Sequence, residues 1–240
     1  MVDKNSPLPI YYQLEEEIKH LIETEQLKPG ELLPSEREYA EKHHISRMTV
    51  RQAINNLASE GLLYRQKGKG TFVAEKKFEQ NLQGLTSFSE DMRARGLTPS
   101  SKLVRFEEME ADEKLAANLA VDIGESIFKI ERVRMADQAP LAVETIYTSK
   151  KIAGNMTRED FAPSFYDYIE NTLGHTIKHA DQEIESALAN DKEIKYLQLK
   201  PGDPVLLIER LTYLSNDEPF EYVKSAYRAD KYKFKLQMPR

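Results

Sequence analysis

The sequence predicts an α+β protein with two domains: a small helical domain that ends in a β-hairpin, and a larger antiparallel sheet covered by helices. At the N-terminal end, apolar residues recur at helical spacing in three short segments, and a turn rich in glycine and lysine follows them. From about residue 84 onward, segments that alternate between apolar and polar residues are separated by short helical stretches, which is typical of an antiparallel α+β domain. The 240 residues are enough for two domains with separate apolar cores.

Three helices are expected in the N-terminal domain. The first covers about residues 10–26, where the apolar residues share one helix face. The second covers about residues 36–43 and follows Ser35, which forms a capping-box pattern with the glutamate three residues later. The third begins after the capping residue Ser46 and ends at Gly61, because glycine is the usual residue just after a helix.

A β-hairpin completes this domain. Residues 62–64 and 71–73 have the composition of short strands, and the segment Gln66-Lys67-Gly68-Lys69-Gly70 forms a tight basic turn between them. Together with the helices, this is the order of a helix-turn-helix followed by a wing, which places one helix in the DNA major groove and one loop on the flanking backbone. We therefore expect a winged-helix DNA-binding domain over residues 1–75.

The second domain is expected over residues 84–240, after a polar linker at residues 76–83. Polar turns at residues 137–139 and 216–218 join neighbouring strands as hairpins, so the sheet is expected to be mainly antiparallel. The expected strands are 102–109, 126–136, 140–149, 177–187, 204–215 and 220–229, and the expected helices are 87–95, 112–120, 164–173 and 191–197.

The composition limits the compartment and the partners. The absence of cysteine excludes disulfides and thiolate metal sites. The N-terminal residues lack the apolar run of a signal peptide, and no window approaches the roughly 18 apolar residues of a membrane span, so we expect a cytoplasmic protein without a membrane partner. The net charge of −6 falls on the second domain, whereas residues 46–77 are locally basic, which fits a DNA-binding domain joined to a domain for another ligand.

The start of the third helix carries the side chains best suited to read DNA. Arg47 and Arg51 share one helix face, and Arg47 lies in the first turn, where its guanidinium matches the O6 and N7 acceptors of guanine. Thr49 suits a phosphate or a thymine methyl group, and the wing supplies glycines for close backbone approach and lysines for charge. Each feature alone is more often a solvated face or an ordinary turn, but their order along the chain favours DNA binding. The expected DNA contacts are Arg37, Ser46, Arg47, Thr49, Arg51, Lys67, Gly68 and Lys69.

Two arginines in the strand at residues 126–136 indicate a site for an anion. Because side chains alternate along a strand, Arg132 and Arg134 continue the apolar face that begins with Phe128 and Ile130. A pair of guanidiniums at this spacing is suited to grip a phosphate or a carboxylate. The alternative is a pair of arginines at the rim of the sheet, each bound to an acidic residue.

Further polar residues of the second domain have two interpretations each. Glu144 lies on the apolar face of the next strand, where a buried carboxylate needs either a ligand hydroxyl or amine, or an internal salt bridge. The helix starts at residues 86–91 and 164–166 offer donors to an anion, or simply cap their helices. Glu221 and Tyr227 lie on the last expected strand, where a plain sheet surface is the simplest interpretation. The five histidines have no metal-binding spacing and no nucleophile–base pair stands out, so no metal, cofactor or catalytic residue is expected.

Four segments of the N-terminal domain form a long and specific pattern: Pro9-Ile10-Tyr11-Tyr12-Gln13, Leu33-Pro34-Ser35-Glu36-Arg37, Ser46-Arg47-Met48-Thr49-Val50-Arg51-Gln52-Ala53, and Gly61-Leu62-Leu63-Tyr64-Arg65 with Gly68-Lys69-Gly70-Thr71-Phe72-Val73. This pattern resembles the winged-helix domain of GntR-type bacterial repressors. The resemblance implies that Arg37, Arg47, Arg51 and Gly68 contact an operator.

The second domain is similar to the UTRA effector domain of the HutC-like branch of this family, which has a chorismate-lyase-like fold. The matching segments are Leu82-Gln83-Gly84-Leu85-Thr86-Ser87-Phe88-Ser89-Glu90-Asp91-Met92, Lys129-Ile130-Glu131-Arg132-Val133-Arg134 and Ser225-Ala226-Tyr227-Arg228. The similarity extends over essentially the whole chain and is greatest to repressors of N-acetylglucosamine utilisation. It implies that a phosphate is held by Phe88, Ser89, Arg132, Arg134, Ser164 and Tyr166, and that Glu144, Glu221 and Tyr227 face an amino sugar.

The expected function is that of a ligand-responsive transcriptional repressor. A homodimer paired through the C-terminal sheet would bind double-stranded operator DNA with half-sites about one helical turn apart. The resemblance implies release by glucosamine 6-phosphate or N-acetylglucosamine 6-phosphate, and the first alternative is the same architecture sensing a different sugar phosphate. A lyase-like enzyme is the remote alternative, because the fold is similar but no catalytic set stands out. An architectural DNA-binding protein does not explain a sheet with inward-facing arginines.

Overall fold

The computed structural model describes residues 2–4, 6–75, 77–161 and 164–238. The chain divides into two compact units between Lys77 and Phe78, and each unit is described by itself.

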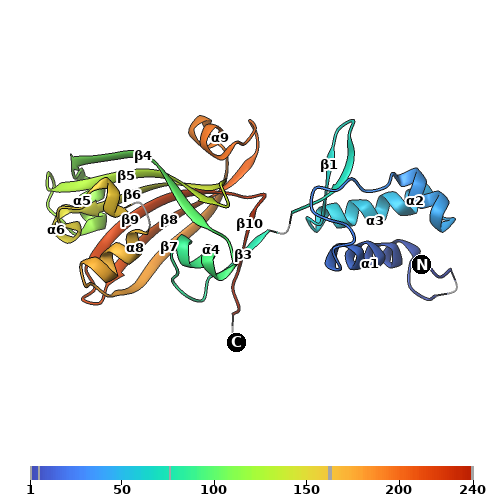
Figure 1. Ribbon diagram of the computed structural model, residues 1–240, viewed down its shortest axis with the longest axis horizontal. Helices are drawn as coiled ribbons and strands as arrows, with labels where there is room; N and C mark the ends of the chain where they lie inside the picture. Colours follow the sequence, from blue (N-terminus) through green and yellow to red (C-terminus); the bar gives the residue numbers. More distant parts are fainter. Residues whose placement is uncertain (1, 5, 76, 162–163, 239–240) are drawn as a thin grey trace. The chain divides into compact units, whose positions relative to one another are not determined.

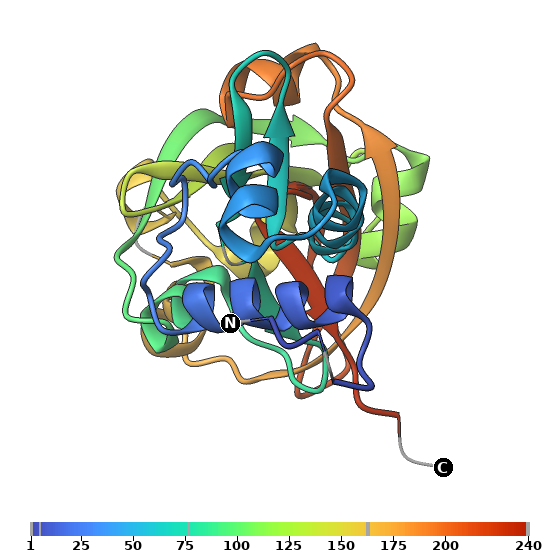
Figure 2. The ribbon, with the colours of Figure 1, turned by 90° about the vertical axis from the view of Figure 1, so that its right-hand side faces the viewer.

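The first unit contains three helices and a β-hairpin (Figure 1): α1 (Ile10–Glu23), α2 (Glu36–His43), α3 (Arg47–Ser59), β1 (Leu63–Gln66) and β2 (Gly70–Val73). The predicted order of elements is confirmed, although α1 ends three residues earlier than expected. Figure 2 shows that the hairpin projects beyond the three helices of its unit.

Local capping fixes where the helices of this unit begin. Ser35 and Glu38 form the predicted reciprocal capping box at the start of α2. The Ser46 hydroxyl accepts a 3.1 Å hydrogen bond from the backbone N–H of Thr49 at the start of α3. Gly61 adopts a positive φ of 75° just after α3, as predicted for a residue that ends a helix. The buried core that holds α1, α2, α3 and the hairpin together comprises Leu14, Ile18, Leu33, Tyr39, Val50, Ala53, Ile54, Leu57, Leu63 and Val73.

The second unit is built on a six-stranded antiparallel sheet with the strand order β4-β5-β6-β9-β8-β7. The predicted antiparallel sheet with helices, and hence the predicted α+β class, is confirmed. The strands are β4 (Pro99–Glu110), β5 (Ser126–Ala136), β6 (Ala139–Ser149), β7 (Ile177–Leu188), β8 (Pro204–Leu214) and β9 (Pro219–Arg228). The helices are α4 (Phe88–Ala94), α5 (Glu113–Leu119), α6 (Lys150–Ala153), α7 (Arg158–Phe161), α8 (Phe165–Asp167) and α9 (Asp191–Leu197).

The structure differs from expectation at the segment between the domains. Residues 78–81, within the predicted linker 76–83, form strand β3 (Phe78–Asn81), which pairs in parallel with β10 (Tyr232–Lys235). Short, polar strands such as β3 give little alternation to recognise, and its partner lies at the far end of the chain. Most of the predicted linker therefore belongs to the second unit, while Lys76 lies outside the described residues.

The helix expected at residues 164–173 is also different. The three-residue α8 continues directly into a π-helical segment, η1 (Tyr168–Thr172), in which backbone hydrogen bonds span five residues where those of an α-helix span four. The short helices α6 and α7 were not expected, because segments of four residues carry no recognisable periodicity.

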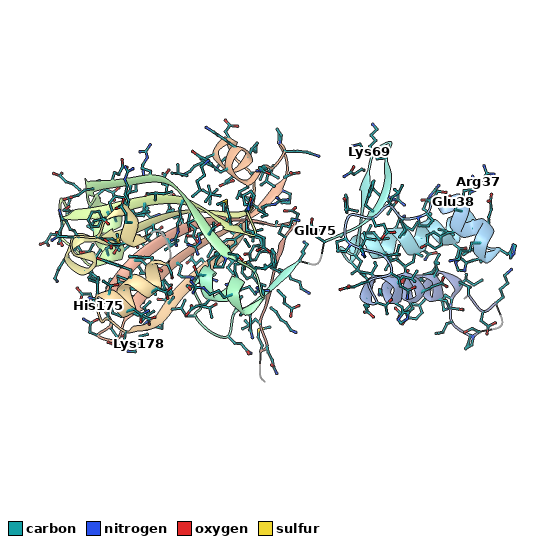
Figure 3. The ribbon with its side chains drawn as sticks, viewed as in Figure 1. Arg37, Glu38, Lys69, Glu75, His175 and Lys178 are labelled. Atoms are coloured by element: carbon teal, nitrogen blue, oxygen red, sulfur yellow. The ribbon has the colours of Figure 1, made fainter. Side chains whose placement is uncertain are left out.

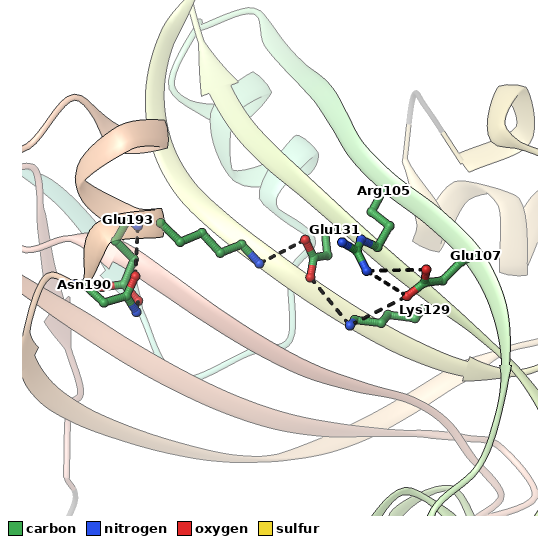
Figure 4. Close-up of polar contacts among 7 residues, drawn as sticks. Arg105, Glu107, Lys129, Glu131, Asn190 and Glu193 are labelled. Atoms are coloured by element: carbon green, nitrogen blue, oxygen red, sulfur yellow. Dashed lines mark hydrogen bonds and ion pairs between the residues drawn. The ribbon is translucent and has the colours of Figure 1, made fainter.

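The two faces of the large sheet are covered differently. On one face, residues of α4, α6 and α8 pack on Phe128, Ile146 and Tyr227. On the other face, α5 covers one end of the sheet and α9 covers the other end. Between α5 and α9 this second face carries a chain of ion pairs (Figure 4), linking Lys192 to Glu131, Glu131 to Lys129, Lys129 to Glu107 and Glu107 to Arg105. The first face carries the buried polar side chains of Arg134, Glu144 and Glu221.

Candidate functional site

The start of α3 presents Arg47 to solvent. Arg47 is the first residue of the helix and is exposed, and within the described part of the chain no hydrogen bond or ion pair engages its side chain. The hydroxyls of Ser46 and Thr49 instead contact each other at 2.8 Å, which fixes the helix start. The exposed Met48 beside Arg47, with 67% of its surface accessible, was not singled out from the sequence. Arg47 is thus free to enter a groove of DNA, while Ser46 and Thr49 hold its backbone.

The other arginines of this surface are held by acidic residues. The Arg51 guanidinium donates to Glu36 at 2.8 and 2.9 Å, and Arg65 on β1 donates to the other oxygen of the same carboxylate at 3.1 Å. Arg37 pairs with Glu41 one helical turn later, at 2.7 Å. The Glu36 and Arg65 side chains were not predicted as part of this surface, because only tertiary contact brings the start of α2, α3 and the hairpin together. Glu36 therefore orients two guanidiniums at once.

A groove brings the predicted DNA contacts of the helices and the wing together. Arg37, Arg47, Arg51 and Lys69 line one hollow between the starts of α2 and α3 and strand β2. Figure 3 shows Arg37 on α2 and Lys69 at the tip of the hairpin. This arrangement gathers positive charge on one side of the unit, as phosphate binding requires.

Glycines shape the hairpin turn. Gly68 has a φ of 76° and open space where a Cβ would lie, so its backbone is accessible to a nearby phosphate. Gly70 has a φ of 125°, and a Cβ there would lie 2.6 Å from the Leu32 side chain. Gly70 is therefore required for packing, whereas Gly68 and the exposed Lys67 are left for contact.

The second unit contains a narrow cavity between the first face of the sheet and the segments that begin α4 and α8. The predicted effector residues come together there: Phe88, Arg132, Arg134, Glu144, Ser164, Tyr166, Glu221 and Tyr227 line the cavity. Ser89 is fully buried behind Arg134 rather than on the lining.

Arg134 is the most deeply buried charged group of the cavity, with 1% of its surface accessible. Its guanidinium donates 2.8 Å hydrogen bonds to the hydroxyls of Ser89 and Ser101, and it lies 4.5 Å from the centre of the Phe88 ring. Among the described residues, no carboxylate lies within ion-pair distance, and its buried Nε has no hydrogen-bond partner. Burial, followed by the neighbouring Arg132, lowers the pKa of Arg134 to about 10, so it still carries its charge at neutral pH.

Arg132 and Glu144 form an internal salt bridge, which was the alternative interpretation of Glu144. The Nε of Arg132 donates to Glu144 at 2.7 Å, and both side chains are buried. Burial opposes ionisation of Glu144, but the guanidiniums of Arg132 and Arg134 outweigh it and hold the pKa of this carboxyl below its usual range. Of the two arginines in the predicted anion site, Arg134 is therefore the one with no carboxylate of the described residues within ion-pair distance, although Glu144 acts on it at longer range.

Glu221 accepts hydrogen bonds from two hydroxyls. Thr212 donates at 2.8 Å and Tyr166 donates at 2.9 Å, both to the same carboxylate oxygen. Burial raises the pKa of Glu221 and exceeds the opposing influence of Arg210. Ser164 caps α8 through the backbone N–H of Asp167 at 3.3 Å, as the alternative interpretation expected, and it also lines the cavity.

Arg210 on β8 lines the cavity but was not predicted. Ile208, Arg210 and Thr212 share a strand face, the same pattern that singled out Arg132 and Arg134, so period-two reasoning applied to β8 identifies it. The cavity thus contains three guanidiniums and two carboxyls, which leaves an excess of positive charge.

The cavity is nearly filled by protein. Its free volume is about 40 Å³, room for no more than a few water molecules. A sugar phosphate is several times larger, so such a ligand enters only if the lining residues move apart. Chemically, the cavity offers a buried cation, hydroxyl donors and two carboxyls.

No group of three or more histidine, aspartate and glutamate side chains in the described part of the chain is arranged to hold a metal ion. None of the helices that the structure describes combines the length and apolar character needed to cross a membrane.

Comparison with known proteins agrees with this architecture. Residues 10–73 match the family model described as bacterial regulatory proteins, gntR family, and residues 94–233 match that of the UTRA domain. The chain is 49% identical to the HTH-type transcriptional repressor NagR of Bacillus subtilis, over all of this chain and 98% of that protein. It is 30% identical to the mannosyl-D-glycerate transport/metabolism system repressor MngR of Escherichia coli, over 95% of each. The crystal structure of PhnF from Mycobacterium smegmatis is similar with a TM-score of 0.68 and 31% identity, over 94% of this chain and 98% of that one.

Proposed function

Because this chain belongs to the GntR family of bacterial regulatory proteins and carries a UTRA domain, we propose that it is a transcriptional repressor that a phosphorylated amino sugar releases from its operator. The ligand is glucosamine 6-phosphate or N-acetylglucosamine 6-phosphate. The repressor acts in the cytoplasm as a homodimer, and its operator has two half-sites related by the dimer axis.

The observation that carries the ligand proposal is the buried guanidinium of Arg134. A buried charge is costly unless a counter-charge or strong hydrogen bonds compensate it. Ser89 and Ser101 supply neutral acceptors only, at 2.8 Å each. A phosphate at this point supplies the missing negative charge, and Phe88, Ser164 and Tyr166 complete its surroundings.

The carboxyls of the cavity suggest where the sugar part of the ligand binds. Glu144 and Glu221 offer acceptors for hydroxyls or an amine, and Tyr227 lies on the same strand as Glu221. A different sugar phosphate is the second candidate, because MngR is 30% identical over 95% of each chain and is named for a mannosyl-D-glycerate system. A lyase-like activity is not proposed, since NagR and MngR are both repressors.

The DNA-binding surface is proposed to use two kinds of contact. Arg47 reads a guanine edge, and Arg51, oriented by Glu36, supports it from the next helical turn. The exposed residues Arg37, Lys67, Gly68 and Lys69 contact the phosphate backbone, which positions the domain without specifying sequence.

Release of DNA follows if the ligand binds better to a conformation that does not fit the operator. The cavity of about 40 Å³ must enlarge to admit a sugar phosphate, so ligand binding and rearrangement are coupled. A coupling of about 1–3 kcal/mol is typical of such regulators.

A titration of the protein–DNA complex tests the proposal. A labelled DNA fragment selected by the protein from a random-sequence library is held in complex, and its fluorescence anisotropy is followed while each sugar phosphate is added. Release by an amino-sugar phosphate, and not by the unphosphorylated sugar, is expected. Anisotropy that stays high at saturating amounts of every sugar phosphate would contradict the proposal.

A further inference from the structure

Met48 is an exposed apolar side chain on the DNA-binding surface. It is the second residue of α3, directly after Arg47, and 67% of its surface is accessible. In the described part of the first unit, no other large apolar side chain is as exposed. The whole of α3 is described, and its other exposed residues are all polar: Arg47, Arg51, Gln52, Asn55 and Ser59. Met48 does not belong to the core of its unit, so it is available to an outside partner.

Contacts within the unit hold the Met48 side chain in place. The Nη1 group of Arg51, one helical turn later, donates to the Met48 sulfur at 3.9 Å. The same guanidinium donates from Nε and Nη2 to Glu36 at 2.9 and 2.8 Å, which connects the start of α3 to the start of α2. An unbranched thioether is flexible by itself, and the contact with Arg51 restricts its rotamers. Met48 is therefore presented to solvent as an ordered apolar group.

The charges around Met48 favour DNA as its partner. Arg47 and Arg51, its neighbours along the chain and along the helix face, line one hollow together with Arg37 and Lys69. An apolar side chain surrounded by cations matches the major groove, where phosphates flank the edges of the bases. Met48 also lies in the first turn of α3, the part of a recognition helix that contacts base edges.

The major groove offers a methyl group to an apolar side chain at thymine. Guanine, adenine and cytosine present hydrogen-bond donors and acceptors there, whereas thymine presents its C5 methyl group beside one acceptor. The thioether of Met48 has no donor and only a weak acceptor, so it is poorly suited to the polar base edges. Because Met48 directly follows Arg47, the thymine that it contacts lies beside the guanine that Arg47 reads.

We propose that Met48 is a specificity-determining residue that recognises the C5 methyl group of a thymine in each operator half-site. The contact buries the end of the Met48 side chain against this methyl group, and Arg51 supports it through the Met48 sulfur. The inference rests on the proposed reading of DNA by α3, and it adds a second base to the one assigned to Arg47.

Operators that lack single methyl groups test this assignment with the full-length protein. The wild type selects an operator from a random-sequence library, and each thymine of one half-site is replaced in turn by deoxyuridine, which lacks only the methyl group. Burial of one carbon group of this size corresponds to about 0.8 kcal/mol, or about fourfold in affinity. We expect one replacement to weaken wild-type binding by about fourfold, and the same replacement to leave the affinity of Met48→Ala unchanged.

Matched variants separate the methyl contact from other effects. Met48→Leu keeps an apolar side chain and should still distinguish thymine from deoxyuridine. Leu8→Ala removes an exposed apolar side chain that does not line the hollow of Arg47, so it should behave as the wild type. An apolar contact releases no counterions, so Met48→Ala should keep the wild-type slope of log affinity against log salt concentration. Lys69→Ala, which removes a phosphate contact, should lower that slope by about one.

The outcomes distinguish this assignment from the proposed function. Deoxyuridine effects that are equal in the wild type and in Met48→Ala at every position would overturn it, and so would a selected half-site without thymine. In either case the reading of DNA by α3 stands if Arg47→Ala relaxes the sequence preference. If neither Arg47→Ala nor Met48→Ala changes the preference between operator and random DNA, the reading by α3 fails and the role of Met48 fails with it.

Discussion

The guanidinium of Arg134 on β5 donates a 2.8 Å hydrogen bond to the hydroxyl of Ser89 on α4. This contact joins the large sheet to the helix that follows β3, close to the start of the second unit. Arg134 is buried and charged, so its partners decide whether the cavity is stable when empty. Two serine hydroxyls satisfy its N–H groups only in part, and the charge itself is left for a ligand.

We predict that Arg134→Met abolishes the response to sugar phosphates without abolishing DNA binding. The substitution keeps much of the side-chain volume but removes the charge that grips a phosphate. Thermal unfolding checks this, because a ligand that binds the folded state raises the Tm of the wild type. The variant is expected to show no shift at a ligand concentration that saturates the wild type, and to keep its affinity for operator DNA. A full Tm shift in Arg134→Met would place the phosphate elsewhere.

For the DNA-binding unit, Arg47→Ala is expected to weaken operator binding by about 1–3 kcal/mol and to relax the sequence preference. The reason is that Arg47 is exposed at the first turn of α3, with no acidic residue of the described chain holding it. Gel-shift titrations on operator and random DNA measure both effects. Lys69→Ala is the control, since loss of a phosphate contact weakens both DNAs alike. Equal losses for Arg47→Ala on the two DNAs argue against base reading by this residue.

Glu36→Ala is predicted to lower specificity while raising affinity for random DNA. Glu36 holds Arg51 at 2.8 Å and Arg65 at 3.1 Å, so its removal frees two guanidiniums and deletes a negative charge near the phosphates. Non-specific binding depends on total positive charge, whereas base reading depends on a fixed orientation. The ratio of operator to random-DNA affinity, measured across a range of salt concentrations, is expected to fall. An unchanged ratio would mean that Glu36 does not orient Arg51 on DNA.

A dependence on pH is expected from Glu221. Burial raises its pKa in the folded protein, so the folded state holds this proton more tightly than the unfolded state does. Its contribution to stability is fully present below the unfolded pKa near 4.5 and is lost as the pH rises through the folded pKa. Glu221→Gln preserves the acceptor for Thr212 and Tyr166 but cannot ionise. The Tm of this variant should therefore exceed that of the wild type at pH 8 and approach it at pH 4, and a constant difference would contradict the assignment.

The sequence predicted the local elements well, because capping residues and apolar spacing act over a few residues. Ser35, Ser46 and Asp112 each begin the helix expected of them. The hairpin turn at Asp137 and Gln138 was recognisable from its polar residues, and both adopt a positive φ. Pairing between distant segments was not recognisable, as β3 and β10 illustrate, because each strand has only four residues and the two lie far apart in the sequence.

The predicted effector residues do gather around one cavity, because strand periodicity places Arg132, Glu144 and Glu221 on one face of the sheet. The side chains that hold the functional arginines could not be predicted from the sequence. Glu36 meets Arg51, and Gln182 meets Arg210, only through tertiary contacts across α2 and α3 or across β7 and β8. The near closure of the cavity also depends on packing, which residue spacing does not reveal.

The most direct measurement is a crystal structure of the full-length protein with N-acetylglucosamine 6-phosphate. We expect the phosphate to contact Arg134 and Ser89 inside an enlarged cavity, with Glu144 and Glu221 beside the sugar ring. Electron density for the phosphate outside this cavity, or a cavity that is still closed around Arg134 at saturating ligand, would contradict the account.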